Sequence, residues 1–365
     1  MSVESEPLRL IQVGLGGWGR SWAAELLKHP KLVRTEAYVD MAPAMLAALR
    51  DDTAIAESMC FDSFSEALRS TDADTVLVTT ALPHHASVAI EALEAGKDVI
   101  VEKPLAPTLA EARRMIDSAD AAGRQLVVSQ NYRFYPAAQK AAELVRTKAL
   151  GEVGSVSVSF RKYANTAEPE GWSHYVLPDP LLMDMSVHHF DLMRFVLGRE
   201  PRSVAAAAWN PSWSRFRDPA SAIAQVVFGD DLVVDYRGSW VSTARPTLWS
   251  GEWVLECENG TIEWTGRDDS GTTADELVIH HRDGEIENVA LPSRPYFDRV
   301  GTIAEFAAAR RESRMPQTHA RDNINTLLLT LGTIAASRAG TVVQLDAVDA
   351  ASDDTINKSN TKEAL

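Results

Sequence analysis

Hydrophobic and polar positions alternate in two different ways along the chain, and the change falls near residue 128. Before it, short apolar runs predict strands at 8–13, 32–39, 74–80, 97–102 and 125–129. Amphipathic stretches predict helices between them, at 18–28, 43–50, 64–69, 85–95 and 109–122. Four of the strands are almost entirely apolar, which is typical of a parallel sheet buried on both faces. The pattern therefore predicts a doubly wound α/β domain over residues 1–128.

Residues 129–345 predict a second domain of the α+β class. Tight turns at 229–231 and 258–260 join successive strands, which favours a large open, mainly antiparallel sheet. Strands are expected at 152–163, 202–209, 222–228, 232–240, 253–264, 276–281 and 341–345, and helices at 137–147, 181–197, 297–311 and 321–339. Residues 346–365 are polar and without pattern, so a disordered tail is expected.

The outer face of this second sheet is expected to be apolar. We place Ala205–Ala208, Val226, Val233 and several tryptophans on it. A continuous exposed apolar face usually marks an interface. The pattern therefore predicts a homodimer or a homotetramer.

Gly14, Gly16, Gly17, Trp18 and Gly19 form a glycine-rich turn between the first strand and the first helix. The first glycine permits a tight turn, the second a close approach to a pyrophosphate, and the last close packing of helix and strand. The helix N-terminus adds free amides and a positive dipole. The turn predicts a dinucleotide site.

Asp40 ends the second strand, where a carboxylate that binds the ribose 2′-hydroxyl belongs. A carboxylate repels a 2′-phosphate, and the following Met41, Ala42 and Pro43 offer no cation to neutralise one. NAD is therefore favoured as the cofactor and NADP is less favoured.

Two further strand ends carry polar groups at the edge where open α/β sheets bind ligands. Thr79 and Thr80 end one strand, and Glu102, Lys103 and Pro104 end the next. Lys103 could donate to the cofactor or to a substrate oxygen, or could be a surface lysine. The proline keeps Lys103 out of helical geometry, and a cis bond between them is one option.

Asp184, His188 and Asp191 are spaced to project from one face of the predicted helix 181–197. One interpretation is a metal site, because histidine and carboxylates at this spacing are legitimate ligands. Another makes Asp184 an orienting acid and His188 a general base, with Asp191 hydrogen-bonded structurally. A third is a helix with partly exposed histidines and no chemistry.

Charge and cysteine content exclude several classes of protein. The formal net charge is −15, which disfavours nucleic acid and anionic membranes as partners. The chain has no apolar run of about 18 residues and no basic, apolar leader at its start. Cys60 and Cys257 are far apart and lack metal-ligand spacing. We expect a cytoplasmic protein without a structural metal.

Four segments together resemble one family. They are the glycine-rich turn, the tripeptide 102–104, the segment 130–136 and the segment 184–198. In combination they are similar to the glucose–fructose oxidoreductase and inositol dehydrogenase (Gfo/Idh/MocA) family over residues 8–345. The resemblance implies an N-terminal Rossmann domain and a C-terminal domain whose open sheet mediates oligomers. It also implies NAD(P)-dependent oxidation of a hydroxyl on a sugar, a polyol or a related small molecule.

The resemblance also assigns roles to single residues. Lys103 matches the lysine beside the nicotinamide, and Asp184 and His188 match the substrate-facing acid and the acid/base histidine. Substrate contacts are expected from the loops 161–175 and 237–250, with Arg161 and Trp172 as candidates. The remaining cofactor contacts are expected at Thr80, His85, Glu102 and Asn131. Two departures are Ala81-Leu82 in place of Pro-Asn and Ser186 in place of Gly.

These assignments predict a dehydrogenase in which His188 moves the hydroxyl proton while a hydride is exchanged with the cofactor. The alternative is a non-catalytic, NAD-responsive regulatory protein, because a fold by itself does not imply catalysis. An intact set of Lys103, Asp184 and His188 favours the enzyme.

Overall fold

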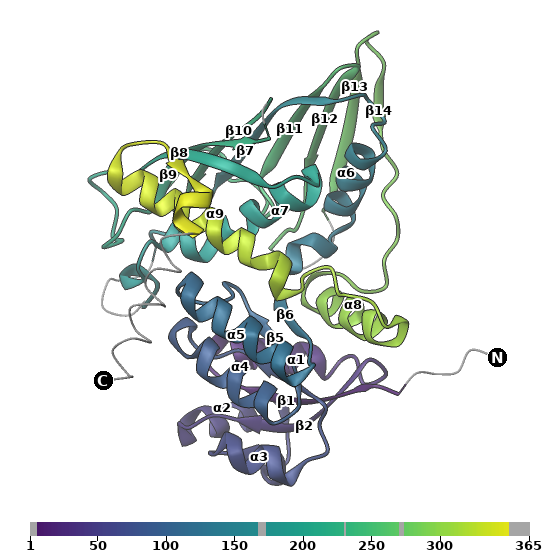
Figure 1. Ribbon diagram of the computed structural model, residues 1–365, viewed down its shortest axis with the longest axis vertical. Coiled ribbons are helices and arrows are strands. Elements are labelled where there is room, and N and C mark those ends of the chain that lie inside the picture. Colours follow the sequence, from purple (N-terminus) through teal and green to yellow (C-terminus); the bar gives the residue numbers. More distant parts are fainter. Residues whose placement is uncertain (1–5, 167–172, 230, 270–273, 350–365) are drawn as a thin grey trace, which may run out of the picture. The chain divides into compact units, whose positions relative to one another are not determined.

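The computed structural model describes residues 6–166, 173–229, 231–269 and 274–349 (Figure 1). Contacts between Cα atoms divide the chain into two compact units. The first unit contains residues up to Asn131 together with Arg299–Ile324, and the second contains Tyr132–Asp298 and the chain from Asn325 onward. Each unit is described by itself.

The first unit is built on a six-stranded sheet in the order β3-β2-β1-β4-β5-β6, with every neighbouring pair parallel. The order steps outward from β1 in both directions, which makes this the doubly wound sheet that the sequence predicts. Only β3 has no counterpart in the prediction, because two residues are too short to leave a pattern. The strands are β1 (Leu8–Val13), β2 (Val33–Val39), β3 (Cys60–Phe61), β4 (Thr75–Val78), β5 (Asp98–Glu102) and β6 (Leu126–Ser129).

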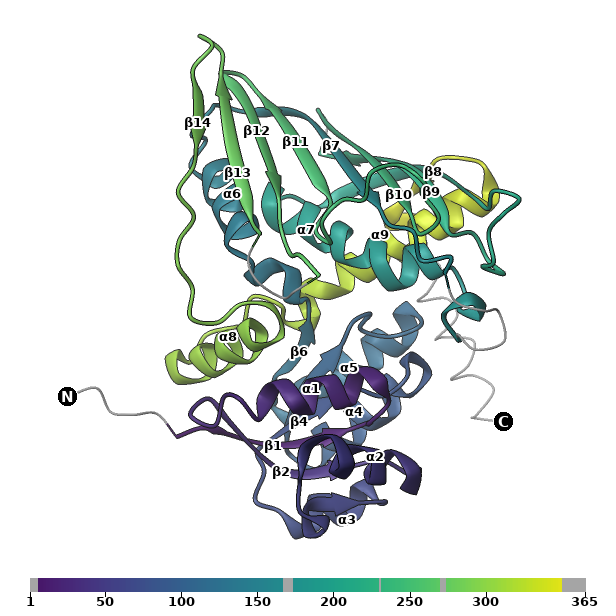
Figure 2. The same ribbon diagram turned by 180° about the vertical axis from the view of Figure 1, so that it is seen from behind.

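Helices cover both faces of this sheet. On one face α4 and α5 pack against each other, and on the opposite face lies α1 (Figures 1 and 2). Helix α5 begins at the N-cap Thr108, whose hydroxyl accepts from the Glu111 amide, and ends at Gly123 with φ 62°. The helices are α1 (Gly17–Leu26), α2 (Pro43–Thr53), α3 (Phe64–Ser70), α4 (His85–Glu94), α5 (Leu109–Ala122) and α8 (Asp298–Glu312).

Helix α8 corrects the expectation that residues 129–345 form one continuous second domain. Ile303 and Phe306 of α8 are fully buried against Leu10 and Trp22, in a core of the first unit. The chain therefore returns to the first unit over Arg299–Ile324 before it re-enters the second. The hydrophobic pattern of a helix shows which of its faces is buried but not which partner buries it.

The second unit is built on a nine-stranded sheet in the order β14-β13-β12-β11-β7-β10-β9-β8-β15. All neighbouring pairs are antiparallel except β7 and β10, so the sheet is mixed and mainly antiparallel, as the sequence predicts. The strands are β7 (Val153–Arg161), β8 (Pro201–Trp209), β9 (Ser221–Phe228), β10 (Leu232–Ser239), β11 (Glu252–Cys257), β12 (Gly260–Thr265), β13 (Glu276–His281), β14 (Ile286–Asn288) and β15 (Val343–Gln344).

One face of this sheet is covered by α6 (Pro136–Arg146), α7 (Val187–Leu197) and the part of α9 (Ala320–Ala339) that belongs to the second unit (Figures 1 and 2). The main core lies between them, and it includes the stacked pair Trp253 and Trp264 with ring centroids 4.8 Å apart.

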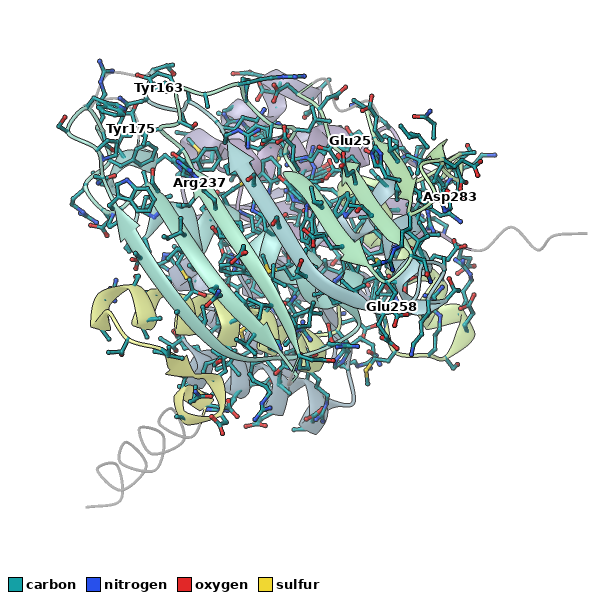
Figure 3. All side chains as sticks on the ribbon, turned by 90° about the horizontal axis from the view of Figure 1, so that it is seen from above. Glu25, Tyr163, Tyr175, Arg237, Glu258 and Asp283 are labelled. Carbon is teal, nitrogen blue, oxygen red and sulfur yellow. The ribbon has the colours of Figure 1, made fainter. Side chains whose placement is uncertain are left out.

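The other face of the sheet carries both polar and apolar side chains, so the expectation of a continuous apolar face is correct only for part of it, which includes Ala205, Ala207 and Val233. Figure 3 looks onto it, with Arg237 labelled, and no helix of the described residues crosses it there. Of the residues expected on this face, Val226 is fully buried, and three of the tryptophans (Trp240, Trp253 and Trp264) are buried as well. The register places Arg237, Asp235 and Gln225 on this face beside the small apolar side chains. In these strands both alternating sets of residues contain apolar side chains, so the sequence pattern does not show which set faces the core.

The structure describes only the first four residues of the expected tail, 346–349. Residues 346–349 are helical, and 350–365 lie outside the described residues. Among the residues that the structure describes, no helix is both long and apolar enough to cross a membrane.

Candidate active site

The glycine-rich turn joins β1 to α1 in the first unit, and two of its glycines are required by contact. Gly14 has φ 96°, and a Cβ there would lie 2.6 Å from the Thr80 backbone nitrogen. A Cβ on Gly19 would lie 2.1 Å from the Gly14 carbonyl oxygen. Gly16 and Gly17 are exposed, and a Cβ on either would meet nothing within 4 Å. The turn thus combines a tight backbone with an open surface that fits a pyrophosphate.

Asp40 follows β2 and is tied to this turn. Its Oδ2 accepts from the Leu15 amide at 2.7 Å, and its Oδ1 accepts from the Ala42 amide at 2.9 Å. The carboxylate is half-buried and each oxygen keeps a further lone pair, so it can accept from a ribose hydroxyl. The structure also places Arg20 beside the turn, because its Nη1 donates to the Leu15 carbonyl at 3.2 Å. Arg20 lies outside residues 41–43, the segment in which the sequence predicts no cation, so its proximity to the turn is not evident from the sequence.

Two residues expected to contact the cofactor, Thr79 and His85, form hydrogen bonds to the backbone of the turn and of neighbouring strand ends. The Thr79 hydroxyl donates to the Gly14 carbonyl at 2.6 Å, which fixes the turn from β4. The ring nitrogens of His85 lie 3.0 Å from the Pro104 carbonyl and 3.1 Å from the Thr80 carbonyl. Burial lowers the pKa of His85, so the ring is neutral and donates to one of these carbonyls at a time. We therefore regard both as positioning residues.

Glu102 and Lys103 end β5, and the bond from Lys103 to Pro104 is cis. The buried Glu102 carboxylate accepts from Trp22 Nε1 of α1 at 2.7 Å through Oε1. Its Oε2 accepts from the Lys103 amide at 3.1 Å. Glu102 thus faces the interior of the first unit and fixes the backbone from which Lys103 projects.

The remaining residues of the first unit that are expected to contact the cofactor are Trp18, Thr80 and Asn131. Trp18 is 44% exposed at the start of α1, and the Arg299 guanidinium lies 4.6 Å from its ring centroid. Asn131 follows β6 and is buried. Thr80 is half-buried after β4. These three stand at the carboxyl ends of strands or at the helix start, the edge where such sheets bind ligands.

Asp184 and His188 lie in the second unit, and the helix that carries them differs from the expected one. Pro180–Ser186 forms a π-helical segment, and α7 begins only at Val187. Asp184 and Asp191 have different partners, because Asp191 is paired with Arg133. Asp184 instead lies beside His174, with Oδ2 3.8 Å from Nδ1. Sequence reasoning missed His174, which precedes the segment by only a few residues.

His188 is buried and stacks on Tyr132, with ring centroids 4.0 Å apart and an interplanar angle of 8°. The Arg267 guanidinium donates to the Tyr132 hydroxyl and lies 4.6 Å from the centroid of its ring. Burial raises the pKa of Tyr132, and the nearby Asp184 carboxylate adds to this rise. Nδ1 of His188 is buried, so Nε2 is the nitrogen that can face a substrate.

Asp191 has the structural role that one of the three interpretations gave it. Its carboxylate accepts from Arg133 Nε at 2.6 Å and Nη2 at 2.7 Å, and from the Thr326 hydroxyl at 3.1 Å. A carboxylate committed to a guanidinium is a poor metal ligand. Among the described residues there is no group of three or more acidic, histidine or cysteine side chains placed to hold a metal ion. Asp191 is therefore not available as the third ligand of the metal site considered from the sequence.

His189, next in sequence, is fully buried and has a different environment. Its Nε2 lies 3.0 Å from the Trp249 carbonyl and its Nδ1 3.1 Å from the Tyr236 hydroxyl. Burial lowers the pKa of His189 to about 4. The neutral ring donates from Nε2 and accepts at Nδ1, and it joins α7 to the sheet. Because both histidines are buried, the interpretation with partly exposed histidines is wrong.

The two residues expected to contact substrate from the loops have different outcomes. Arg161 ends β7, where its Nε donates to the Arg245 carbonyl at 3.0 Å and its Nη2 lies 2.5 Å from Glu252. These bonds hold the side chain against the sheet. Trp172 lies outside the described residues. Lys103 belongs to the first unit and Asp184 and His188 to the second. Joining these three in one active site is part of the function proposed below.

A glycine-rich turn tied to an acidic strand end, on a doubly wound sheet, defines a dinucleotide-binding protein. Residues 8–130 match the model of the oxidoreductase family with an NAD-binding Rossmann fold, and residues 138–263 match the GFO/IDH/MocA C-terminal domain. The chain belongs to the GFO/IDH/MocA family and is an oxidoreductase, which confirms the resemblance seen in the sequence.

Named relatives and solved structures agree with this assignment. D-apiose dehydrogenase of Paraburkholderia graminis is 30% identical over 76% of this chain and 74% of its own. Inositol 2-dehydrogenase 4 of Saccharopolyspora erythraea is 27% identical over 94% of this chain and 98% of its own. Aldose–aldose oxidoreductase of Caulobacter crescentus, solved with glycerol, has a TM-score of 0.79 at 20% identity and covers 93% of this chain and 99% of its own. These relatives make the enzyme, rather than the regulatory protein, the class to which the chain belongs.

Proposed function

We propose that this protein is an NAD-dependent dehydrogenase that interconverts a hydroxyl and a carbonyl on a sugar or polyol. The observation that carries the proposal is the pair of His188, stacked on Tyr132, and Asp184 on the preceding π-helical segment. The names of the relatives, which include an apiose and an inositol dehydrogenase, support the substrate class. A screen of sugars and polyols with NAD, read by the absorbance of NADH, tests it.

The side chains divide the chemistry between them. The nicotinamide cofactor, when bound, supplies the hydride acceptor or donor. Nε2 of His188 takes the hydroxyl proton in oxidation and returns it in reduction. The Lys103 ammonium donates to the substrate oxygen as charge develops on it. Asp184, beside His174, orients a neighbouring hydroxyl or the imidazole. Tyr132 fixes the plane of the His188 ring.

The cofactor-binding residues are Gly14, Gly16, Gly17, Trp18, Gly19, Asp40, Thr80, Lys103 and Asn131, with Thr79, His85 and Glu102 supporting them from behind. The first unit offers the open amides of the turn to the pyrophosphate and Asp40 to the adenosine ribose. A cytoplasmic location belongs to the same proposal, because the two free cysteines suit a reducing compartment.

We expect NAD to bind more tightly than NADP, because Asp40 accepts from a 2′-hydroxyl and repels a 2′-phosphate. Asp40→Ser removes that charge and should narrow or reverse the preference. Dissociation constants from tryptophan fluorescence check it. Asp62→Ser, which changes an acid beyond β3 instead, is the control. Equal affinities of the unmodified protein for both cofactors would contradict the expectation.

We also expect a homodimer or homotetramer formed through the uncovered sheet face, which carries both polar and apolar side chains. It contains a shallow hollow of about 590 Å³ whose lining includes the small side chains of Ser157, Ala205 and Ala207. Small side chains allow a second copy to approach the strands closely. Light scattering at micromolar concentration should show the oligomer, and Ala207→Arg should weaken it, whereas Ala95→Arg at the C-cap of α4 should not. A monomer at every concentration is the opposing result.

A further inference from the structure

Two charged side chains beside the glycine-rich turn form hydrogen bonds to the same residue of it, Leu15. Asp40 accepts from the amide of Leu15 at 2.7 Å, and Arg20 donates to the carbonyl of Leu15 at 3.2 Å. Arg20 follows the last glycine of the turn, on α1. The Arg20 guanidinium and the Asp40 carboxylate, which is proposed to bind the adenosine ribose, are therefore separated by the backbone of a single residue.

A third charge restrains this guanidinium. Arg20 Nε donates to Asp52 Oδ2 of α2 at 3.0 Å, and Nη1 also contacts the Met45 sulfur at 3.6 Å. The Asp52 side chain is 57% exposed and the Arg20 side chain 27% exposed. The pair is thus accessible to solvent and held from two sides. Of the charges on Asp40, Arg20 and Asp52, the sum is −1.

We propose that Asp52 determines cofactor specificity by holding Arg20 away from the adenosine 2′ position. The inference rests on the proposed function, in which Asp40 binds the ribose. A guanidinium is the preferred partner of a phosphate because it donates two parallel hydrogen bonds. With Asp52 in place, the Arg20 charge is offset and its Nε is already bonded, so a 2′-phosphate of about −2 charge meets a net negative surface. Without Asp52, the same arginine can turn to a phosphate.

The experiment compares Asp52→Asn with Asp51→Asn. The two aspartates are neighbours on α2, both are exposed, and each substitution removes one negative charge. Only Asp52 bonds Arg20. Dissociation constants for NAD and NADP are measured on the full chain by calorimetry, so no substrate is needed. We expect Asp52→Asn to tighten NADP binding about threefold to fivefold, the upper scale of an exposed ion pair, and to leave the affinity for NAD within about twofold.

Two further measurements make the result specific. In the double variant Arg20→Met/Asp52→Asn the gain in NADP affinity should disappear, because the guanidinium is gone. The gain should also shrink as salt is raised, since charges at the surface are screened. Asp51→Asn should change the affinity for either cofactor by less than about twofold.

The outcomes separate this inference from the proposed function. Equal responses of Asp52→Asn and Asp51→Asn, or a gain that survives Arg20→Met, overturn the inference while NAD binding and the proposed function stand. A protein that binds neither dinucleotide overturns both. An active-site variant that loses turnover but binds the cofactor normally supports the proposed function and does not affect the inference about Asp52.

Discussion

His188→Ala is expected to lower kcat by about 10²–10⁴-fold, the usual contribution of a positioned acid or base. Without the imidazole, the hydroxyl proton has to leave to water while the hydride is exchanged. The change is measured by steady-state kinetics on a substrate found in the screen. Affinity for NAD should stay near that of the unmodified protein, because the glycine-rich turn and Asp40 lie in the other unit.

Lys103→Ala is expected to cost about 10²–10³-fold, the effect of removing one donor to a developing oxyanion. Because Lys103 and His188 act on one transition state, the double variant should be little worse than the worse single variant. Lys28→Ala and His281→Ala, on the surfaces of the two units, are the matched controls. Near-normal turnover in both site variants would contradict the assignment. Tight NAD binding with no activity on any screened sugar or polyol would contradict the proposed substrate class.

The first half of the site could be predicted from the sequence because its requirements are local. Gly14 and Gly19 are needed by contacts within one turn, and Asp40 is fixed by the length of one helix and one strand. Such features depend on short stretches of chain, so the pattern of residues contains them. What Asp52 does to Arg20 depends on the packing of α1 against α2, and no short motif records it.

The part of the site that lies in the second unit was harder to predict from the sequence, because the helix that contains it begins with an irregular, π-helical segment. The spacing of Asp184, His188 and Asp191 suggested a single stripe on a regular helix. Asp184 instead lies on a π-helical segment beside His174, and Asp191 is paired with Arg133. The stacking partner Tyr132 comes from a segment more than fifty residues away in the sequence, and Arg267 from still further along. Long-range partners of this kind leave no periodic signal. The return of Arg299–Ile324 to the first unit is unpredictable for the same reason.

The Arg133–Asp191 pair offers the largest effect on stability. Both side chains are almost fully buried, and the pair is bidentate, with Thr326 as a third partner. Asp191→Asn removes the negative charge of this buried ion pair, and breaking such a pair from one side costs about 3–5 kcal/mol. The free energy of unfolding of the second unit, measured by denaturant titration, should fall by that amount.

Arg34→Met breaks the exposed pair with Glu36 and is the control, expected to change stability by at most about 1 kcal/mol. Asp191→Asn also distinguishes a structural role of Asp191 from a role as a ligand of a metal or of the substrate. If the carboxylate bound a metal or the substrate, Asp191→Asn would lower turnover or make it metal-dependent while the unfolding curve stayed unchanged. A buried structural pair gives the opposite result, because its loss lowers the free energy of unfolding and any loss of turnover follows the fraction of protein that is unfolded.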